Sequence, residues 1–245
     1  TPVSAVALAH LGTTVFLALP GPGVDVVRVN PPNAPFKIAS LPNTFGVTSV
    51  GAAAGVTFAY GQSETHAKAF ENVDRAFVLL PAGHVDSKGL LLPVIEAAAK
   101  RGVKVVLQSV FGVDADDSIP YRQVELALQN SGTPYVILRP NWFADNFHTF
   151  WKAGIDHGQI SLPAGEGKTS FIDARDIADC AVTALGTSTF DGRAFNLTGP
   201  AALSYAEAAA ILSRSIGRQI TYSSITDDAF VGMLTAAGLP RDYAQ

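Results

Sequence analysis

Asn141, Trp142 and Phe143 place an amide and two aromatic rings next to one another in the chain. They follow residues 134–138, a β-branched run that is typical of a buried strand. Aromatic rings beside a single amide offer a large stacking area and few polar contacts, which suits a flat, conjugated small molecule. The sequence therefore predicts an apolar binding site that begins where this strand ends.

Metal and disulfide chemistry are not expected. The five histidines have no metal-ligand spacing with Cys180 or with one another, so we predict no metal site. Because Cys180 is the only cysteine, an intrachain disulfide framework is excluded and a cytoplasmic location is favoured.

The charge and hydropathy patterns exclude other classes of protein. A net charge of -4 argues against a broad nucleic-acid surface, which would need clustered Lys and Arg. Residues 3–19 carry no charge, but no basic segment precedes them as in a signal peptide, and no purely apolar run is long enough to cross a membrane. We therefore expect no nucleic-acid partner and no membrane attachment.

Strands and helices alternate through most of the chain. Residues 24–29, 76–80, 103–107 and 134–138 read as strands, and helices are predicted for 88–100 and 120–128. This order is typical of an α/β fold with a parallel sheet covered by helices on both faces. The alternation breaks down after Phe143, which divides the chain into residues 1–140 and a smaller lobe, 141–245, with elements able to cross between the two.

Several segments, in this order, resemble the NmrA-like family of atypical short-chain dehydrogenases/reductases. They are 73–81 (VDRAFVLLP), 138–147 (LRPNWFADNF), 171–178 (FIDARDIA), 196–200 (NLTGP) and 203–209 (LSYAEAA). The resemblance covers residues 56–245 and implies a Rossmann-type doubly wound parallel sheet that binds NAD(P) at the carboxyl ends of its strands. It also implies a smaller C-terminal α/β lobe over the substrate.

The resemblance implies a set of cofactor contacts in the loops after successive strands. They are Leu11, Gly12, Arg28, Leu80, Pro81, Ala82, Ser109, Val110, Pro140 and Asn141. The first loop should read G-x-x-G-x-x-G, but the expected positions hold Val6, Ala9 and Gly12. Either phosphate binding is weakened or residues 1–55 depart from the family sequence.

The implied substrate contacts are Phe111, Tyr121, Trp142 and Phe143. Ordinary short-chain dehydrogenases donate a proton from a Tyr-x-x-x-Lys pair, which is absent here. The resemblance places Tyr121 where relatives carry Lys or His, so Tyr121 is the candidate catalytic acid. The alternative is an aromatic residue that packs at the start of a helix.

Two functions follow from the resemblance. The first is an NAD(P)H-dependent oxidoreductase that transfers hydride to a conjugated acceptor such as a quinone, azo dye or imine, with NADP(H) preferred and NAD(H) possible. The second is a non-catalytic NAD(P)-sensing regulatory protein of the same fold. Either would act on a small aromatic or conjugated ligand as a monomer or homodimer.

Arg28 gives a test of cofactor preference, because NADP-preferring relatives present an arginine to the 2′-phosphate near this position. If Arg28 binds that phosphate, Arg28→Ala should weaken NADPH binding more than NADH binding by about 1–3 kcal/mol, as expected for a lost charge-assisted bond. Fluorescence titration with both cofactors measures this. Equal losses would show that Arg28 has another role.

Overall fold

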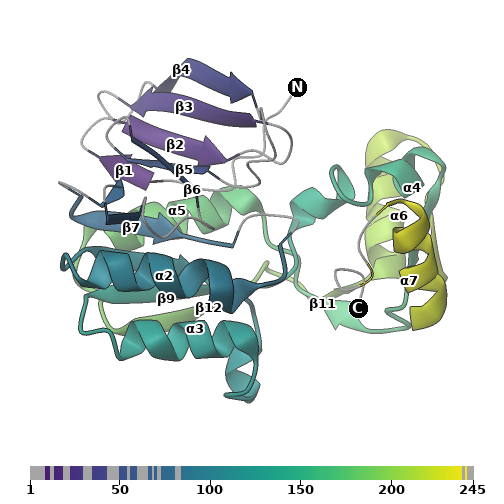
Figure 1. Ribbon diagram of the computed structural model, residues 1–245. Helices are drawn as coiled ribbons and strands as arrows, with labels where there is room; N and C mark the ends of the chain where they lie inside the picture. The colour runs from purple at the N-terminus through teal and green to yellow at the C-terminus, as the bar shows by residue number, and fades with distance from the viewer. Residues whose placement is uncertain are drawn as a thin grey trace. The chain divides into compact units, whose positions relative to one another are not determined.

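The computed structural model describes the backbone of six strands between residues 9 and 59, then residues 66–67, 69–70, 73–80 and 84–238, together with Arg241. The chain divides into two compact units (Figure 1). The first contains residues 1–140 and 174–197, and the second contains residues 141–173 and 198–245.

The first unit contains a four-stranded parallel sheet. Its order is β12-β9-β8-β7, from β7 (Arg75–Val78), β8 (Lys104–Gln108), β9 (Tyr135–Pro140) and β12 (Arg193–Leu197). The predicted strands at 76–80, 103–107 and 134–138 are confirmed within a few residues. Their β-branched composition suits a sheet that is buried on both faces.

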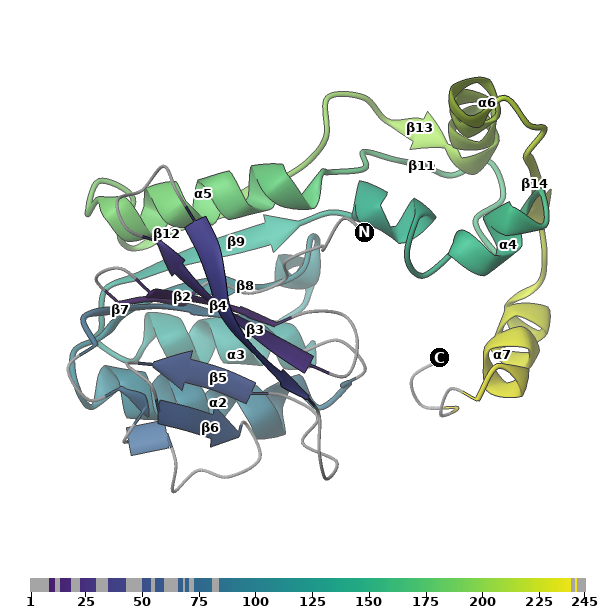
Figure 2. The same ribbon diagram turned by 90° about the horizontal axis from the view of Figure 1, so that it is seen from above.

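Helices cover both faces of this sheet, as Figure 2 shows. One face packs on α2 (Ser87–Ala99) and α3 (Pro120–Gln129), and the other packs on α5 (Ala174–Gly186). Because side chains alternate along a strand, Val105 and Leu107 face the first pair of helices while Val106 faces α5. The doubly wound architecture predicted from sequence is confirmed.

Local signals set the ends of α2 and α3. The Asp86 side chain accepts a hydrogen bond of 2.7 Å from the Gly89 amide and so caps α2. Gly102, with a φ of 67°, provides the left-handed turn after α2. Pro120 is the first residue of α3, where its missing N–H has no partner to lose. These short-range interactions explain why the sequence located both helices.

The N-terminal strands pair differently from the prediction. Strands β1 (Ala9–Leu11), β2 (Thr14–Ala18), β3 (Gly23–Val29) and β4 (Pro35–Pro42) form an antiparallel sheet in chain order, and β5 (Val50–Ala53) pairs with β6 (Val56–Ala59). The expected strand at 24–29 exists as β3, but it pairs in this antiparallel sheet and not in the parallel sheet that the order of strands and helices predicted. The connections 12–13, 19–22 and 30–34 are too short to join parallel strands, because a parallel crossover needs about a dozen residues or more.

The second unit is built around two small sheets and an aromatic core. Its elements are η2 (Ala144–Phe147), α4 (Lys152–Asp156), β10 (Gln159–Leu162), β11 (Lys168–Thr169), β13 (Leu203–Ser204), α6 (Tyr205–Ile216), β14 (Thr221–Ser224) and α7 (Asp227–Ala236). Strand β10 pairs with β14, and β11 pairs with β13. The predicted division assigned 141–245 to this lobe with elements able to cross between the two parts, and α5 and β12 are such elements, because they cover the second face of the first unit's sheet and complete it. Within the described residues, every helix is too short or too polar to cross a membrane.

Gly199, in the NLTGP segment, lies against the backbone of residues 170–171. Its amide donates to the Ser170 carbonyl oxygen at 3.3 Å. A Cβ atom at this position would stand 1.8 Å from the Phe171 carbonyl oxygen. Only glycine permits this approach without a shift of the backbone.

Gly199→Ala should therefore lower the free energy of unfolding by about 1–3 kcal/mol, as for other overpacked sites. Gly232→Ala is the matched control, since Gly232 lies inside α7 and a Cβ atom added there would have no atom within 4 Å apart from its chain neighbours and the backbone of its own helix. The control should gain up to about 1 kcal/mol from helix propensity. Urea unfolding followed by tryptophan fluorescence measures both, because Trp142 and Trp151 lie in the same unit. Equal effects of the two substitutions would contradict the close approach at Gly199.

Candidate functional site

The carboxyl ends of the parallel strands bring three of the predicted loops to one edge of the first unit. Leu80, Ser109 and Pro140 lie at or just after the ends of β7, β8 and β9. The Ser109 amide donates to the Leu138 carbonyl oxygen at 2.7 Å, and the Phe111 amide donates to the Pro140 carbonyl oxygen at 3.1 Å. The segment that follows β8 is thereby fastened to the end of β9.

Apolar side chains are exposed at this edge. Val110 is 41% exposed and Phe111 is 43% exposed, while Ser109 beside them is buried. Large apolar side chains that stay exposed are informative when they gather at a place where the fold exposes ligand contacts. Val110 and Phe111 provide a surface on which a planar ring can stack.

Tyr121 lies at the second position of α3 and is half-buried. Its ring packs against the hydrophobic cluster that α2 and α3 form with the sheet. This packing agrees with the structural alternative that the sequence left open. Its role as an acid stays a prediction.

Asn141 begins the second unit and joins two of its segments. Its Oδ1 accepts hydrogen bonds from the Trp142 amide at 2.8 Å and from Thr169 Oγ1 at 3.2 Å. Phe143 pairs with Ile172 in a parallel bridge, and the Ile172 amide donates to the Trp142 carbonyl oxygen at 2.9 Å. Residues 141–143 therefore have a fixed backbone, although Trp142 is 53% exposed.

An aromatic cluster supports Trp142. Its ring centroid lies 6.0 Å from that of Trp151, which contacts Phe147 and Tyr205 edge-on at 5.0 Å and 5.4 Å. Burial, together with the neighbouring Tyr222, raises the pKa of Tyr205 to about 12, so this phenol stays neutral. The cluster supports one side of the Trp142 ring with apolar contacts and leaves the ring partly exposed to solvent.

The cofactor contact of Asn141 and the substrate contacts of Phe111, Tyr121, Trp142 and Phe143 stay predictions. Phe111 and Tyr121 belong to the first unit, and the other three residues belong to the second. Leu11 lies in β1 and Arg28 in β3, but their side chains, together with Gly12, Pro81 and Ala82, lie outside the described residues. Within the described part of the chain, no cluster of His, Cys, Asp and Glu could hold a metal ion.

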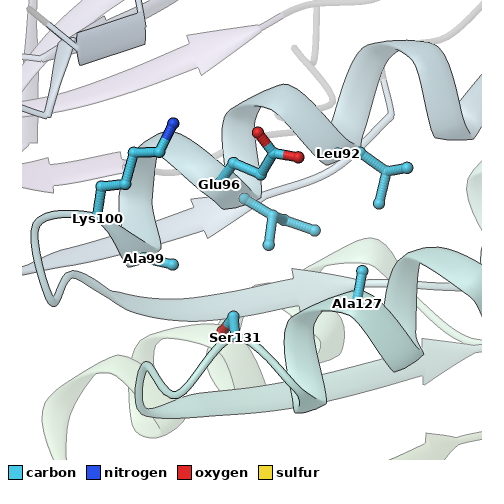
Figure 3. A pocket seen from close by; sticks show the side chains of 7 residues that line it. Leu92, Glu96, Ala99, Lys100, Ala127 and Ser131 are labelled. Atoms are coloured by element: carbon cyan, nitrogen blue, oxygen red, sulfur yellow. The ribbon is translucent and has the colours of Figure 1, made fainter.

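A groove of about 440 Å³ lies between α2 and α3 (Figure 3). It is lined by Leu92, Ile95, Glu96, Ala99, Lys100, Ala127 and Ser131. None of the predicted site residues lines it. The groove is a space between two helices and not the expected nucleotide site.

A buried ion pair beneath the carboxyl edge was not found by sequence reasoning. Glu125 of α3 is fully buried, and Arg139 at the end of β9 is 6% exposed. Arg139 donates from Nε to Glu125 Oε1 at 2.9 Å and from Nη2 to Oε2 at 2.7 Å. Arg122 adds a third bond to Glu125 at 3.0 Å. The sequence signals were an acidic residue next to Val124 on the buried side of α3 and an arginine near the end of a buried strand, but neither indicated the other as its partner.

The surroundings of Glu125 keep it ionised. Burial raises the pKa of Glu125, but the bonds from Arg139 and Arg122 and the nearby Ser109 hydroxyl outweigh it, so the pKa lies below its ordinary value of 4.5. The hydrogen bond to Glu125 raises the pKa of Arg139. Both groups are therefore charged at neutral pH.

A parallel sheet with helices on both faces and an open carboxyl edge defines a Rossmann-type α/β protein. The model of the NmrA-like family matches residues 43–245. The chain belongs to the NmrA-like family. The matched residues include the whole parallel sheet and the second unit, whereas Leu11, Gly12 and Arg28 precede them.

Individual relatives agree with this assignment. The chain is 36% identical over 190 residues to prestalk A differentiation protein A of Dictyostelium discoideum, covering 76% of this chain and 62% of that protein. It is 35% identical over 201 residues to the NAD(P)H azoreductase of Xenophilus azovorans, covering 78% and 70%. Among solved structures, an Escherichia coli NADPH-dependent quinone oxidoreductase complexed with NADPH matches at 25% identity with a TM-score of 0.68, covering 77% and 68%. The chain thus spans roughly two thirds of the length of such relatives.

Removal of one partner from the buried pair should be costly. Glu125→Gln removes the buried carboxylate that Arg139 binds and leaves the partly exposed Asp114 as its described acidic partner, which should lower the free energy of unfolding by about 3–5 kcal/mol. The double variant Glu125→Leu/Arg139→Met removes both charges. Its loss in the free energy of unfolding should therefore be smaller than the sum of the losses in the two single variants.

The pH dependence checks the same interaction. Because folding depresses the pKa of Glu125, its contribution to stability is fully present above pH 4.5 and is lost as the pH falls through the lower folded-state value. The difference between wild type and Glu125→Gln, measured by urea unfolding, should therefore shrink in acid. A constant difference from pH 7 to pH 3 would contradict an ionised Glu125.

Proposed function

We propose that the protein is an NAD(P)H-dependent oxidoreductase that transfers a hydride to a conjugated acceptor such as a quinone, an azo compound or an imine. The observation that carries the proposal is the exposed apolar pair Val110 and Phe111 at the carboxyl edge of the parallel sheet, held by the bond from Phe111 to Pro140. The matches to an azoreductase and a quinone oxidoreductase support it.

The chemistry of this edge fits a nicotinamide cofactor. Leu80 and Val110 would present apolar surface to a planar ring, with Ser109 just after β8 and Pro140 at the end of β9. Pro81, Ala82 and Asn141 would extend this contact, while Leu11, Gly12 and Arg28 would serve the phosphates. We propose NADP(H) as the preferred cofactor, with NAD(H) also accepted; when bound, it supplies the hydride.

Asn141 and the neighbouring rings would position the acceptor. The bonds described for Asn141 both use Oδ1, which leaves its N–H groups to donate to an acceptor oxygen or nitrogen. A donor there would stabilise the negative charge that develops as hydride arrives. Phe111, Trp142 and Phe143 would supply stacking area. Quinones and azo compounds can take their protons from water, so a strong acid at Tyr121 is not required.

The alternative is a non-catalytic NAD(P)-sensing regulatory protein. The packing of Tyr121 against the helix core and the lack of the usual Lys or His favour it. Both functions involve a small-molecule ligand, a cytoplasmic location and a monomer or homodimer. They differ only in whether the acceptor is turned over.

Trp142→Ala should lower kcat/KM for most acceptors together by about tenfold, within the range of ~1–3 kcal/mol for lost apolar contact. Phe150→Ala is the matched control, because Phe150 is also exposed and in the same unit. NADPH oxidation is assayed over quinones, azo dyes and cyclic imines, with cofactor affinity measured separately.

Two outcomes would count against the proposal. Tight NADPH binding by the wild type without turnover of any acceptor would favour the sensor. Equal losses in Trp142→Ala and Phe150→Ala would show that the Trp142 ring has no special part in acceptor binding.

A further inference from the structure

Arg139 connects three segments of the first unit through one guanidinium group. Its Nε and Nη2 donate two parallel hydrogen bonds to the Glu125 carboxylate of α3, called the fork below. Its Nη1 pairs with Asp114 of η1 (Val113–Ala115). The residue itself stands one position before the end of β9. The chain after β8, the helix α3 and the end of β9 are thus joined at one side chain.

The segment after β8 carries the apolar surface of the candidate site. The bond from the Phe111 amide to the Pro140 carbonyl oxygen holds the segment on one side of the turn. Gly112, with a φ of 81°, reverses the chain, and Asp114 returns to Arg139 on the other side. Phe111 is therefore held between two attachments to neighbouring residues of β9.

A buried ion pair is not needed to stabilise this place in the fold. Apolar side chains of similar volume often give equal or greater stability than a buried pair. The planar fork of arginine instead fixes direction, because its parallel N–H groups match a carboxylate in one orientation and leave Nη1 aimed at Asp114. The ion pair between Glu125 and Arg139 therefore fixes the orientation of the Arg139 guanidinium.

We propose that Arg139 is a positioning residue which, through Asp114 and Glu125, fixes Phe111 at the carboxyl edge of the sheet. For the part that concerns turnover, this rests on the proposed reductase function, in which Phe111 stacks on the acceptor. The ion pair between Arg139 and Asp114 can be tested alone, because its removal leaves the buried hydrogen bonds between Arg139 and Glu125 in place.

The experiment compares Asp114→Asn with Asp117→Asn. Asp117 is the matched control, because its carboxylate pairs with Arg122 at 2.8 Å and makes no described bond to Arg139. Hydrogen exchange of the Phe111 amide, followed by NMR, should accelerate about tenfold in Asp114→Asn as its bond to Pro140 opens more often. It should stay within about twofold of wild type in Asp117→Asn.

Arg139→Lys supplies a second variant, since it keeps the charge and loses the fork. It should accelerate exchange of the Phe111 amide at least as much as Asp114→Asn. Unchanged exchange in both folded variants would overturn the proposal, and so would equal acceleration in Asp117→Asn.

Kinetics separate positioning from general loss of stability. Asp114→Asn should raise the acceptor KM about tenfold while its Tm and its affinity for NADPH stay near wild type. Unchanged acceptor KM in an active enzyme would overturn the link to turnover. If the wild type turns over no acceptor, the reductase function fails, and the amide exchange alone decides whether Arg139 positions Phe111.

Discussion

The burial of the parallel strands on both faces is the constraint on which the rest of the first unit depends. Val106 and Leu107 point to opposite faces of β8 and are both fully buried, so helices must cover each side. With both faces covered, a ligand can reach the sheet only at its edges. The loops at the carboxyl ends are therefore where the exposed apolar residues Val110 and Phe111 become available for binding.

The same burial explains why the ion pair between Glu125 and Arg139, next to this edge, needs accurate geometry. Glu125 and Arg139 are buried, and unpaired charges would be strongly unfavourable there. Each is satisfied by the other, while Arg139 Nη1 also donates to Asp114 and Glu125 Oε2 also accepts from Arg122. An interaction that tolerates little change in geometry thus lies directly behind the segment that carries Phe111.

The second unit uses aromatic packing for a similar purpose. Trp151 and Tyr205 are buried and pack edge to face, and Trp142 rests on this base with half of its surface exposed. Asn141 fixes the preceding turn through Oδ1. Each unit thus presents a partly exposed aromatic ring on a backbone that hydrogen bonds hold in place.

The sequence by itself determined the features that depend on neighbouring residues. The β-branched runs marked β7, β8 and β9, Pro120 marked the start of α3, and ordered motifs indicated the family. Only the tertiary structure decided that residues 174–197 return to the first unit, and that β3 pairs in an antiparallel sheet because its connections are short. It also revealed the pair between Glu125 and Arg139, since neither residue's local pattern encodes a partner 14 positions away. Periodicity and capping act over a few residues, whereas strand order and buried charge pairing depend on which distant segments meet.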